Sequence, residues 1–176
     1  TIHKFNSFLT SYKEVIMLSI NIICIGKLKE NFFRDAITEY SKRLSKYCNL
    51  NFIELPDEKL PSKLNDKIID NIKDSEGKKI LSHLKKDSYK ICLDLNGKQY
   101  SSEEFSSKID SIALNYNSSI TFIIGGTLGI SKDVLNIADE KICFSKMTFP
   151  HQLIRVFLVE QLFRAFKISN NETYHW

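Results

Sequence analysis

The chain has 176 residues, of which 43% are hydrophobic and 26% are charged, and its formal net charge at pH 7 is +4. A chain of this length fits one domain with a sizeable core, and this composition excludes a wholly disordered protein. The small positive charge is compatible with a polyanionic partner but does not require one. No stretch approaches the roughly 20 apolar residues of a membrane helix, so we expect no association with a membrane.

The four cysteines are Cys24, Cys48, Cys92 and Cys143, and none forms a CxxC pair or stands at metal-ligand spacing from a histidine. Three of them lie in apolar, strand-like runs, where cysteine behaves as a small hydrophobic residue. We therefore expect reduced and buried thiols, a cytoplasmic protein and no metal site.

Residues 1–16 differ in character from the rest of the chain, so we expect them to be an extension that precedes a single domain of residues 17–176. From Met17 onward, strand-like and helix-like segments alternate. Strands are expected at 18–25, 50–55, 89–95, 119–124 and 141–144, and helices at 32–46, about 68–84, about 102–114, 132–138 and 150–168. This alternation favours one α/β domain with a mostly parallel sheet and helices on both faces.

Some of the expected elements carry particular sequence signals. The run Leu18–Ile25 is continuously apolar, as in a strand buried on both faces. Gly77 is expected to weaken the middle of the second helix. A serine at 101 or 102 can cap the third helix, whose apolar face is expected to include Leu114. Pro150 is expected at the first position of the last helix.

Three segments after predicted strands are candidates for a ligand site, because ligands of open α/β sheets bind at the carboxyl ends of the strands. They are residues 93–98, 122–129 and 144–155. The first contains the turn signal Asn96-Gly97, and the second contains Gly125, Gly126 and Gly129, which allow a backbone to approach a ligand closely. The glycine spacing matches neither the dinucleotide-binding fingerprint nor a P-loop. A plain tight turn is the alternative for both.

The third segment combines a polar loop with the start of the last helix, where His151 and Arg155 stand four residues apart on one face. Free N–H groups of such a loop can hold an adenine edge or a carboxylate. The alternative is a capped helix with a solvated histidine and arginine. Glu160 and Arg164, also four apart, are interpreted as an ion pair on the helix surface.

The last helix is more apolar than one face of a small sheet requires. A stripe of this width predicts a partner, most simply a second copy of the chain, and hence a homodimer. The chain closes with Tyr174, His175 and Trp176, side chains of the kind that stack on an unpaired base. Because no separate RNA-binding domain is present, phosphate contacts are expected from Lys27, Lys29, Arg34 and Lys98.

In order and spacing, these segments resemble the RlmH family of the SPOUT methyltransferases from about Met17 to the C-terminus. The resemblance is carried by residues 25–29, 93–98, 122–129 and 145–152, by Arg155, Glu160-Gln161 and Arg164-Ala165, and by the closing Tyr174-His175. It implies an S-adenosylmethionine-dependent enzyme that methylates N3 of a pseudouridine in large-subunit ribosomal RNA, within the assembled ribosome. It also implies a homodimer and an α/β fold with a trefoil knot at its C-terminal end.

The resemblance implies site residues as well. The cofactor would be held by Leu93, Gly125, Gly126, Gly129, Phe144, Ser145, Lys146, Met147, Thr148 and Phe149. The candidates on the RNA side are His151, Arg155, Tyr174 and His175. Arg155 would stabilise the developing anion, and either His175 or water would accept the N3 proton.

Two other functions stay open from the sequence. One is an RNA-binding ribosome-assembly factor without catalysis, and the other is a SPOUT enzyme that acts on transfer RNA. A nicotinamide-dependent dehydrogenase is disfavoured, because the glycine spacing differs and no acidic residue follows at a suitable position.

Overall fold

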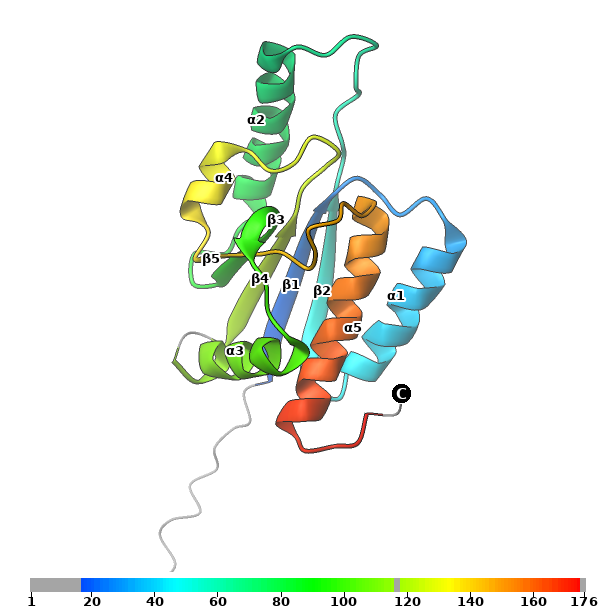
Figure 1. The fold of residues 1–176 in the computed structure, drawn as a ribbon, viewed down its shortest axis with the longest axis vertical. Helices are drawn as coiled ribbons and strands as arrows, with labels where there is room; N and C mark the ends of the chain where they lie inside the picture. The colour runs from blue at the N-terminus through cyan, green and yellow to red at the C-terminus, as the bar shows by residue number, and fades with distance from the viewer. Residues whose placement is uncertain (1–16, 116–117, 175–176) are drawn as a thin grey trace, which may run out of the picture.

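The structure, a computed structural model, describes residues 17–115 and 118–174, in which strands and helices alternate (Figure 1). The strands are β1 (Leu18–Ile25), β2 (Cys48–Leu55), β3 (Tyr89–Lys98), β4 (Ser119–Ile124) and β5 (Glu140–Ile142). The helices are α1 (Asn31–Leu44), α2 (Asp66–His83), α3 (Ser102–Asn115), α4 (Lys132–Ile137) and α5 (His151–Ser169). The predicted order of elements is confirmed.

The strands of the described sheet are all parallel, in the order β2-β1-β4-β3-β5, so the sheet expected to be mostly parallel is wholly parallel. β1 is paired on both sides, and its Ile22 lies in register with Phe52 of β2 and Phe122 of β4. An interior parallel strand with helices on both faces has no solvated side, which explains the continuous apolar run of β1.

A hydrophobic core lies on each face of the sheet. On one face, α1, α3 and α5 pack over Ile20, Ile22 and Phe122, and α5 contacts both of the other helices (Figure 1). On the other face, α2 and α4 pack over Ile23 and Ile123. The prediction of helices on both faces is therefore confirmed, whereas the trefoil knot stays a prediction from the resemblance.

One prediction about a helix interior is wrong. Leu114 does not join the apolar face of α3, because its side chain is 83% exposed. It follows Phe105 by nine residues, which at 3.6 residues per turn places it about 180° away around the helix. Gly77 lies buried inside the unbroken helix α2 and faces the Ser131 side chain at the start of α4, and the expected weakening of this helix stays a prediction.

Two boundaries also differ from the expected ones. Pro150 is not the first residue of α5 but precedes it as the N-cap. Residues 93–98 are not a simple turn after β3, because the strand continues to Lys98. Leu93 and Lys98 both pair with Ile142 of β5, so the chain between them bulges out of the sheet at its carboxyl edge. The bulge keeps these residues beside the other two candidate segments.

The four cysteines are free and buried, as predicted. Burial raises the pKa of the Cys24, Cys48 and Cys92 thiols to about 12, so these three are not nucleophiles near neutral pH. Within residues 17–115 and 118–174, no three His, Cys, Asp or Glu side chains gather as they would around a metal ion. The same residues include no helix long and apolar enough to cross a membrane.

Candidate active site

The three candidate segments line one pocket of about 780 Å³ at the carboxyl edge of the sheet. A pocket of this size can enclose most of a nucleotide-sized ligand. The residues predicted to hold a cofactor that do line it are Leu93, Gly125, Gly126, Gly129, Phe144, Ser145, Met147, Thr148 and Phe149. Lys146 is not among the lining residues. We refer to this hollow as the main pocket.

The glycine turn after β4 forms one wall of the main pocket and is tightly closed. The N–H of Gly129 donates to the carbonyl of Gly126 at 3.1 Å, and Gly129 has a φ of +93° that side chains rarely adopt. A Cβ on Gly125 would lie 2.9 Å from the carbonyl carbon of Gly129. A side chain at position 125 would therefore force the turn to shift or open.

The loop between β5 and α5 forms the opposite wall. Its start is anchored because the Cys143 N–H donates to the Lys98 carbonyl at 2.9 Å. Within the loop, the Met147 N–H donates to the Ser145 hydroxyl oxygen at 3.0 Å. The rings of Phe149 and Phe157 meet edge to face at 5.2 Å and fix the end of the loop against α5. The loop is thus held by local bonds while its inner side stays available to a ligand.

His151 stands at the start of α5 between the main pocket and a second, smaller pocket, and it lines both. The second pocket has a volume of about 280 Å³ and lies beyond the carboxyl ends of β1 and β2. The two pockets also share Thr127 and Leu128 of the glycine turn, so they adjoin each other.

Burial lowers the pKa of His151, and the nearby Arg155 guanidinium lowers this pKa further, against a smaller opposing effect of Asp57. The side chain is therefore neutral at pH 7 and can donate or accept one hydrogen bond on either side.

This shift predicts a pH dependence of stability. The pKa of His151 is lower in the folded than in the unfolded chain, so its contribution is complete above about pH 6.5 and is lost as the pH falls through the folded value. His151→Asn should therefore lose less stability than the wild type between pH 7.5 and pH 5.5, measured by urea denaturation. His83→Asn, at the exposed end of α2, is the control. Identical losses in the wild type and His151→Asn would contradict the expectation.

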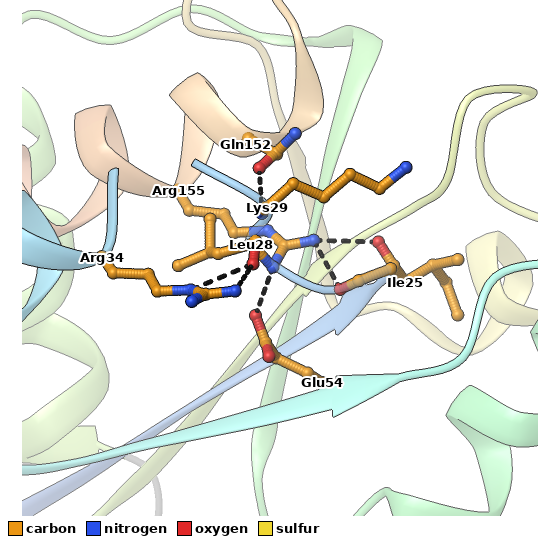
Figure 2. Close-up of polar contacts among 8 residues, drawn as sticks. Ile25, Leu28, Lys29, Arg34, Glu54, Gln152 and Arg155 are labelled. Carbon is orange, nitrogen blue, oxygen red and sulfur yellow. Dashed lines mark hydrogen bonds and ion pairs between the residues drawn. The ribbon is translucent and has the colours of Figure 1, made fainter. Parts of the chain in front are cut away.

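Arg155 does not face either pocket but is fully buried, and it fastens the segment after β1 to α5 (Figure 2). Its Nη1 donates to Glu54 Oε1 at 2.9 Å, and its Nη2 donates to the carbonyls of Ile25 and Gly26, both at 2.9 Å. The same Glu54 oxygen accepts the N–H of Leu28 at 3.0 Å. These acceptors of Arg155 thus belong to the ends of β1 and β2.

Further bonds hold the same segment from outside (Figure 2). Arg34 donates to the Leu28 carbonyl through Nε at 3.1 Å and Nη2 at 2.5 Å, and the Lys29 N–H donates to Gln152 Oε1 at 2.7 Å. The expected role of Arg155 at the substrate does not agree with this burial. We interpret Arg155 as a positioning residue that fixes residues 26–29 along the second pocket.

Comparison with known proteins agrees with the motifs. The sequence profile of the family described as "Predicted SPOUT methyltransferase" matches residues 18–175. A relative from Clostridium acetobutylicum and one from Clostridium novyi, both named ribosomal RNA large subunit methyltransferase H, are 57% and 56% identical. A relative from Clostridium perfringens, named ribosomal RNA large subunit methyltransferase H 1, is 54% identical. Each similarity spans 158 residues, 90% of this chain and 99% of the relative.

The chain belongs to the SPOUT methyltransferase family. It is therefore an enzyme of methyl transfer, and the resemblance predicted from its motifs is confirmed. In a SPOUT methyltransferase, two neighbouring pockets at one sheet edge are the arrangement that a two-substrate transfer needs, because donor and acceptor must be held side by side.

Tyr174 does not line either pocket but lies beside the middle of α5. Its hydroxyl donates to Glu160 Oε1 at 2.7 Å, and the Arg164 guanidinium lies 3.9 Å from the centre of its ring. Burial and this bond raise the pKa of Tyr174 to about 12. Glu160 and Arg164 form the predicted surface pair at 2.8 Å. Glu160 follows His151 by nine residues, which is roughly 13.5 Å along the helix axis. Because Tyr174 is bound to Glu160, it does not reach His151 of the same chain.

The other residues predicted on the RNA side lie in different parts of the chain. His175 and Trp176 lie outside the described residues. Lys27 and Lys29 line the second pocket with exposed side chains. Lys98 lies over the ring of Tyr100, 4.5 Å from its centre.

Sequence reasoning missed several residues of the second pocket, notably Asp57, Glu76 and Gln152. The sequence pattern places Asp57 in an exposed loop, and Glu76 follows no motif within its helix. Only Gln152 lies in one of the three candidate segments. Its contact with the Lys29 backbone spans 123 residues, and no local pattern signals such a contact.

Proposed function

We propose that this SPOUT methyltransferase transfers the methyl group of S-adenosylmethionine to N3 of a pseudouridine in large-subunit ribosomal RNA, within the assembled ribosome. The single observation that carries the proposal is the shared main pocket, built from the segments that bear the resemblance. The names of relatives that align along nearly the whole chain support the substrate. A ribosomal substrate also agrees with the cytoplasmic location expected from the cysteines.

The residues of the main pocket fit S-adenosylmethionine. Apolar walls from Leu93, Ile124 and Ile154 suit the faces of an adenine ring, and the backbone of residues 144–149 offers hydrogen bonds to its edge. Lys73 and Asp94 also line the pocket, and their opposite charges suit a carboxylate and an amino group. When bound, the cofactor supplies a methyl group on a positively charged sulfur.

The chain's own contribution to the reaction is positioning and exclusion of water. The loop before α5 and the glycine turn would fix the donor, and the segment held by Arg155 would form the side on which the acceptor arrives. Holding two reactants in register contributes about 7–11 kcal/mol to lowering a bimolecular barrier.

The direct test is incorporation of a tritiated methyl group from S-adenosylmethionine. The substrates would be 70S ribosomes, separated subunits and transfer RNA, all from a strain that lacks this methylation. We expect label in the large-subunit RNA of 70S ribosomes, at a pseudouridine, and none in transfer RNA. Preferential labelling of transfer RNA, or no labelling by protein that binds the cofactor, would refute the proposal.

Exposed lysines beside the second pocket are proposed to contact phosphates. Replacing Lys27 and Lys29 together by Ala should weaken ribosome binding. It should also reduce the magnitude of the slope of log affinity against log salt concentration by about 1–2. Filter binding at several salt concentrations measures this slope. Lys63 and Lys67, exposed outside both pockets, are the matched control pair. An unchanged slope in the first double variant would remove these lysines from the interface.

We further infer that the enzyme works as a homodimer. Packing inside one chain buries Leu158, Val159 and Leu162 of α5, so part of its wide apolar stripe serves the fold itself. Phe157 and Phe163 of the same helix are only partly buried, which supports a second copy as partner. RNA contact by Tyr174 and His175 stays a prediction.

A further inference from the structure

A buried carboxylate with one unused oxygen forms part of the second pocket. Glu76 comes from α2 and is 5% exposed. Its Oε1 accepts the N–H of Glu58 at 3.0 Å, whereas no hydrogen bond to Oε2 comes from any described residue. Among the described residues, the buried side-chain atoms that lack a hydrogen-bond partner do not include Glu76 Oε2, so this oxygen keeps contact with solvent. Because Glu76 lines the second pocket, a ligand in this pocket can donate a hydrogen bond to Oε2.

Glu76 also lies directly behind the glycine turn that separates the two pockets. A Cβ on Gly126 would come 2.8 Å from Glu76 Oε2 and 3.2 Å from Oε1. Gly126 lines the main pocket, and Thr127 and Leu128 line both pockets. The carboxylate thus reaches the boundary between donor and acceptor sides of the site, where the atoms that react must meet.

The second pocket suits a single nucleobase better than a whole nucleotide cofactor. Its volume of about 280 Å³ is below the range of about 300–1,000 Å³ for drug-sized ligands. Around the acceptor Glu76 stand potential donors on other elements: Lys27 after β1, Thr127 after β4 and His151 on α5. Asp57 and Glu58 line this pocket as well, so it offers carboxylate acceptors beside donors. The edge of a uracil-type base, in which N3–H lies between two carbonyl groups, can pair with an acceptor flanked by donors.

We propose that the second pocket receives the base to be methylated and that Glu76 accepts its N3 proton, an inference that rests on the proposed function. The N3–H bond breaks, its electron pair stays on N3, and the proton binds a Glu76 carboxylate oxygen. The nitrogen so freed is the nucleophile for the methyl transfer of the family. The carboxylic acid then returns the proton to water through the second pocket.

The surroundings of Glu76 favour this task. Burial raises the pKa of Glu76. The hydrogen bond from the Glu58 N–H and the positive charge of Lys79 lower this pKa, whereas the negative charges of the Glu58 and Asp57 side chains raise it. A base whose pKa is raised toward the working pH takes up a proton more effectively. The other ionisable groups that line the second pocket are Lys27, Lys29, Lys59 and His151. Because protonated Glu76 cannot accept, the rate should fall on the acid side.

Glu76→Gln separates this role from a structural one. The amide oxygen can still accept the Glu58 N–H, but the side chain no longer takes up a proton. We expect single-turnover methyl transfer to ribosomes to slow at least about 100-fold at pH 7 and to lose its acid-side decline. Affinity for S-adenosylmethionine, measured by calorimetry, should stay within about twofold. Asp74→Asn, an exposed acid of the same helix, should react like the wild type.

The possible failures are distinguishable. If the wild type transfers methyl and Glu76→Gln is equally fast, the proton goes elsewhere, to His175 or to water, and the assignment of Glu76 is overturned. If the wild type itself labels no ribosomal RNA, the proposed function fails first.

A second readout does not depend on turnover. Saturation-transfer NMR would compare binding of uridine 5′-monophosphate and its N3-methylated analogue to the wild-type protein. The analogue lacks the N3 proton and would leave Glu76 unpaired, so we expect at least about tenfold weaker binding. Glu76→Ala should lose this discrimination. Equal binding of the two nucleotides by the wild type would contradict the assignment, whatever the behaviour of the variants.

Discussion

Replacing Arg155 by Ala is expected to lower the free energy of unfolding by about 3 kcal/mol and to abolish methyl transfer. The change removes the donor for the buried Ile25 and Gly26 carbonyls and the cation beside Glu54. Breaking a buried ion pair costs about 3–5 kcal/mol, and we take the lower end because the Glu54 side chain is 32% exposed and can be rehydrated. Loss of transfer is expected because residues 26–29 would no longer be fixed beside the second pocket.

Urea denaturation of the wild type, Arg155→Ala and Arg155→Lys measures this effect. The lysine variant keeps the charge but cannot serve three acceptors from one planar group, so it should lie between the other two. Arg43→Ala removes an exposed pair with Glu39 and is the matched control, with little expected loss. If Arg155→Ala were as stable as this control, the interpretation of Arg155 as the fastening of this segment would be wrong.

Placing Ala at Gly125 is expected to weaken S-adenosylmethionine binding by about 10- to 100-fold. The added methyl would lie 2.8 Å from Ile130 Cγ1 and 2.9 Å from the Gly129 carbonyl carbon, so the turn must open to relieve the contact. Overpacking of this kind costs about 1–3 kcal/mol. Because the turn must close around the cofactor, this cost is subtracted from the free energy of cofactor binding. Each 1.4 kcal/mol is about tenfold in Kd.

Calorimetric titration with S-adenosylmethionine gives the Kd directly, and circular dichroism confirms that the variant is folded. Met147→Ala provides the control on the opposite wall, because Met147 is 73% exposed and its loss leaves the loop backbone in place. We expect this control to bind within about threefold of the wild type. Wild-type affinity in Gly125→Ala would mean that the glycine turn is not part of the cofactor site.

The fold was predictable where burial is one-sided or complete. The apolar runs at 18–25 and 119–124 predict the first and last residues of β1 and β4 correctly. A parallel strand covered on both faces is apolar along its whole length, so the run itself marks the strand. Residues 93–98 were harder, because the bulge in β3 depends on a second pairing of Lys98 with Ile142 that no local pattern indicates.

The residues of the candidate site likewise fall into those that a local pattern predicts and those that only tertiary packing positions. Segments that approach a ligand through their backbone have a local signature, and this signature predicts the glycines and the polar loop. Arg155 shows the opposite case. The spacing from His151 places Arg155 on one face of the helix but does not show whether that face is buried. Arg155 is buried against Glu54, which is 101 residues away in the chain, so no local pattern indicates this contact. The position of Glu76 behind Gly126 is likewise set by tertiary packing alone.

A crystal structure of the enzyme grown with S-adenosylhomocysteine would show directly whether the main pocket is the cofactor site. We predict density for a bent nucleoside in this pocket, between the turn at Gly125 and the loop of residues 144–149, with its sulfur toward the boundary with the second pocket. Density at another site, or a bound nucleoside whose sulfur points away from Thr127 and Glu76, would contradict the proposed site.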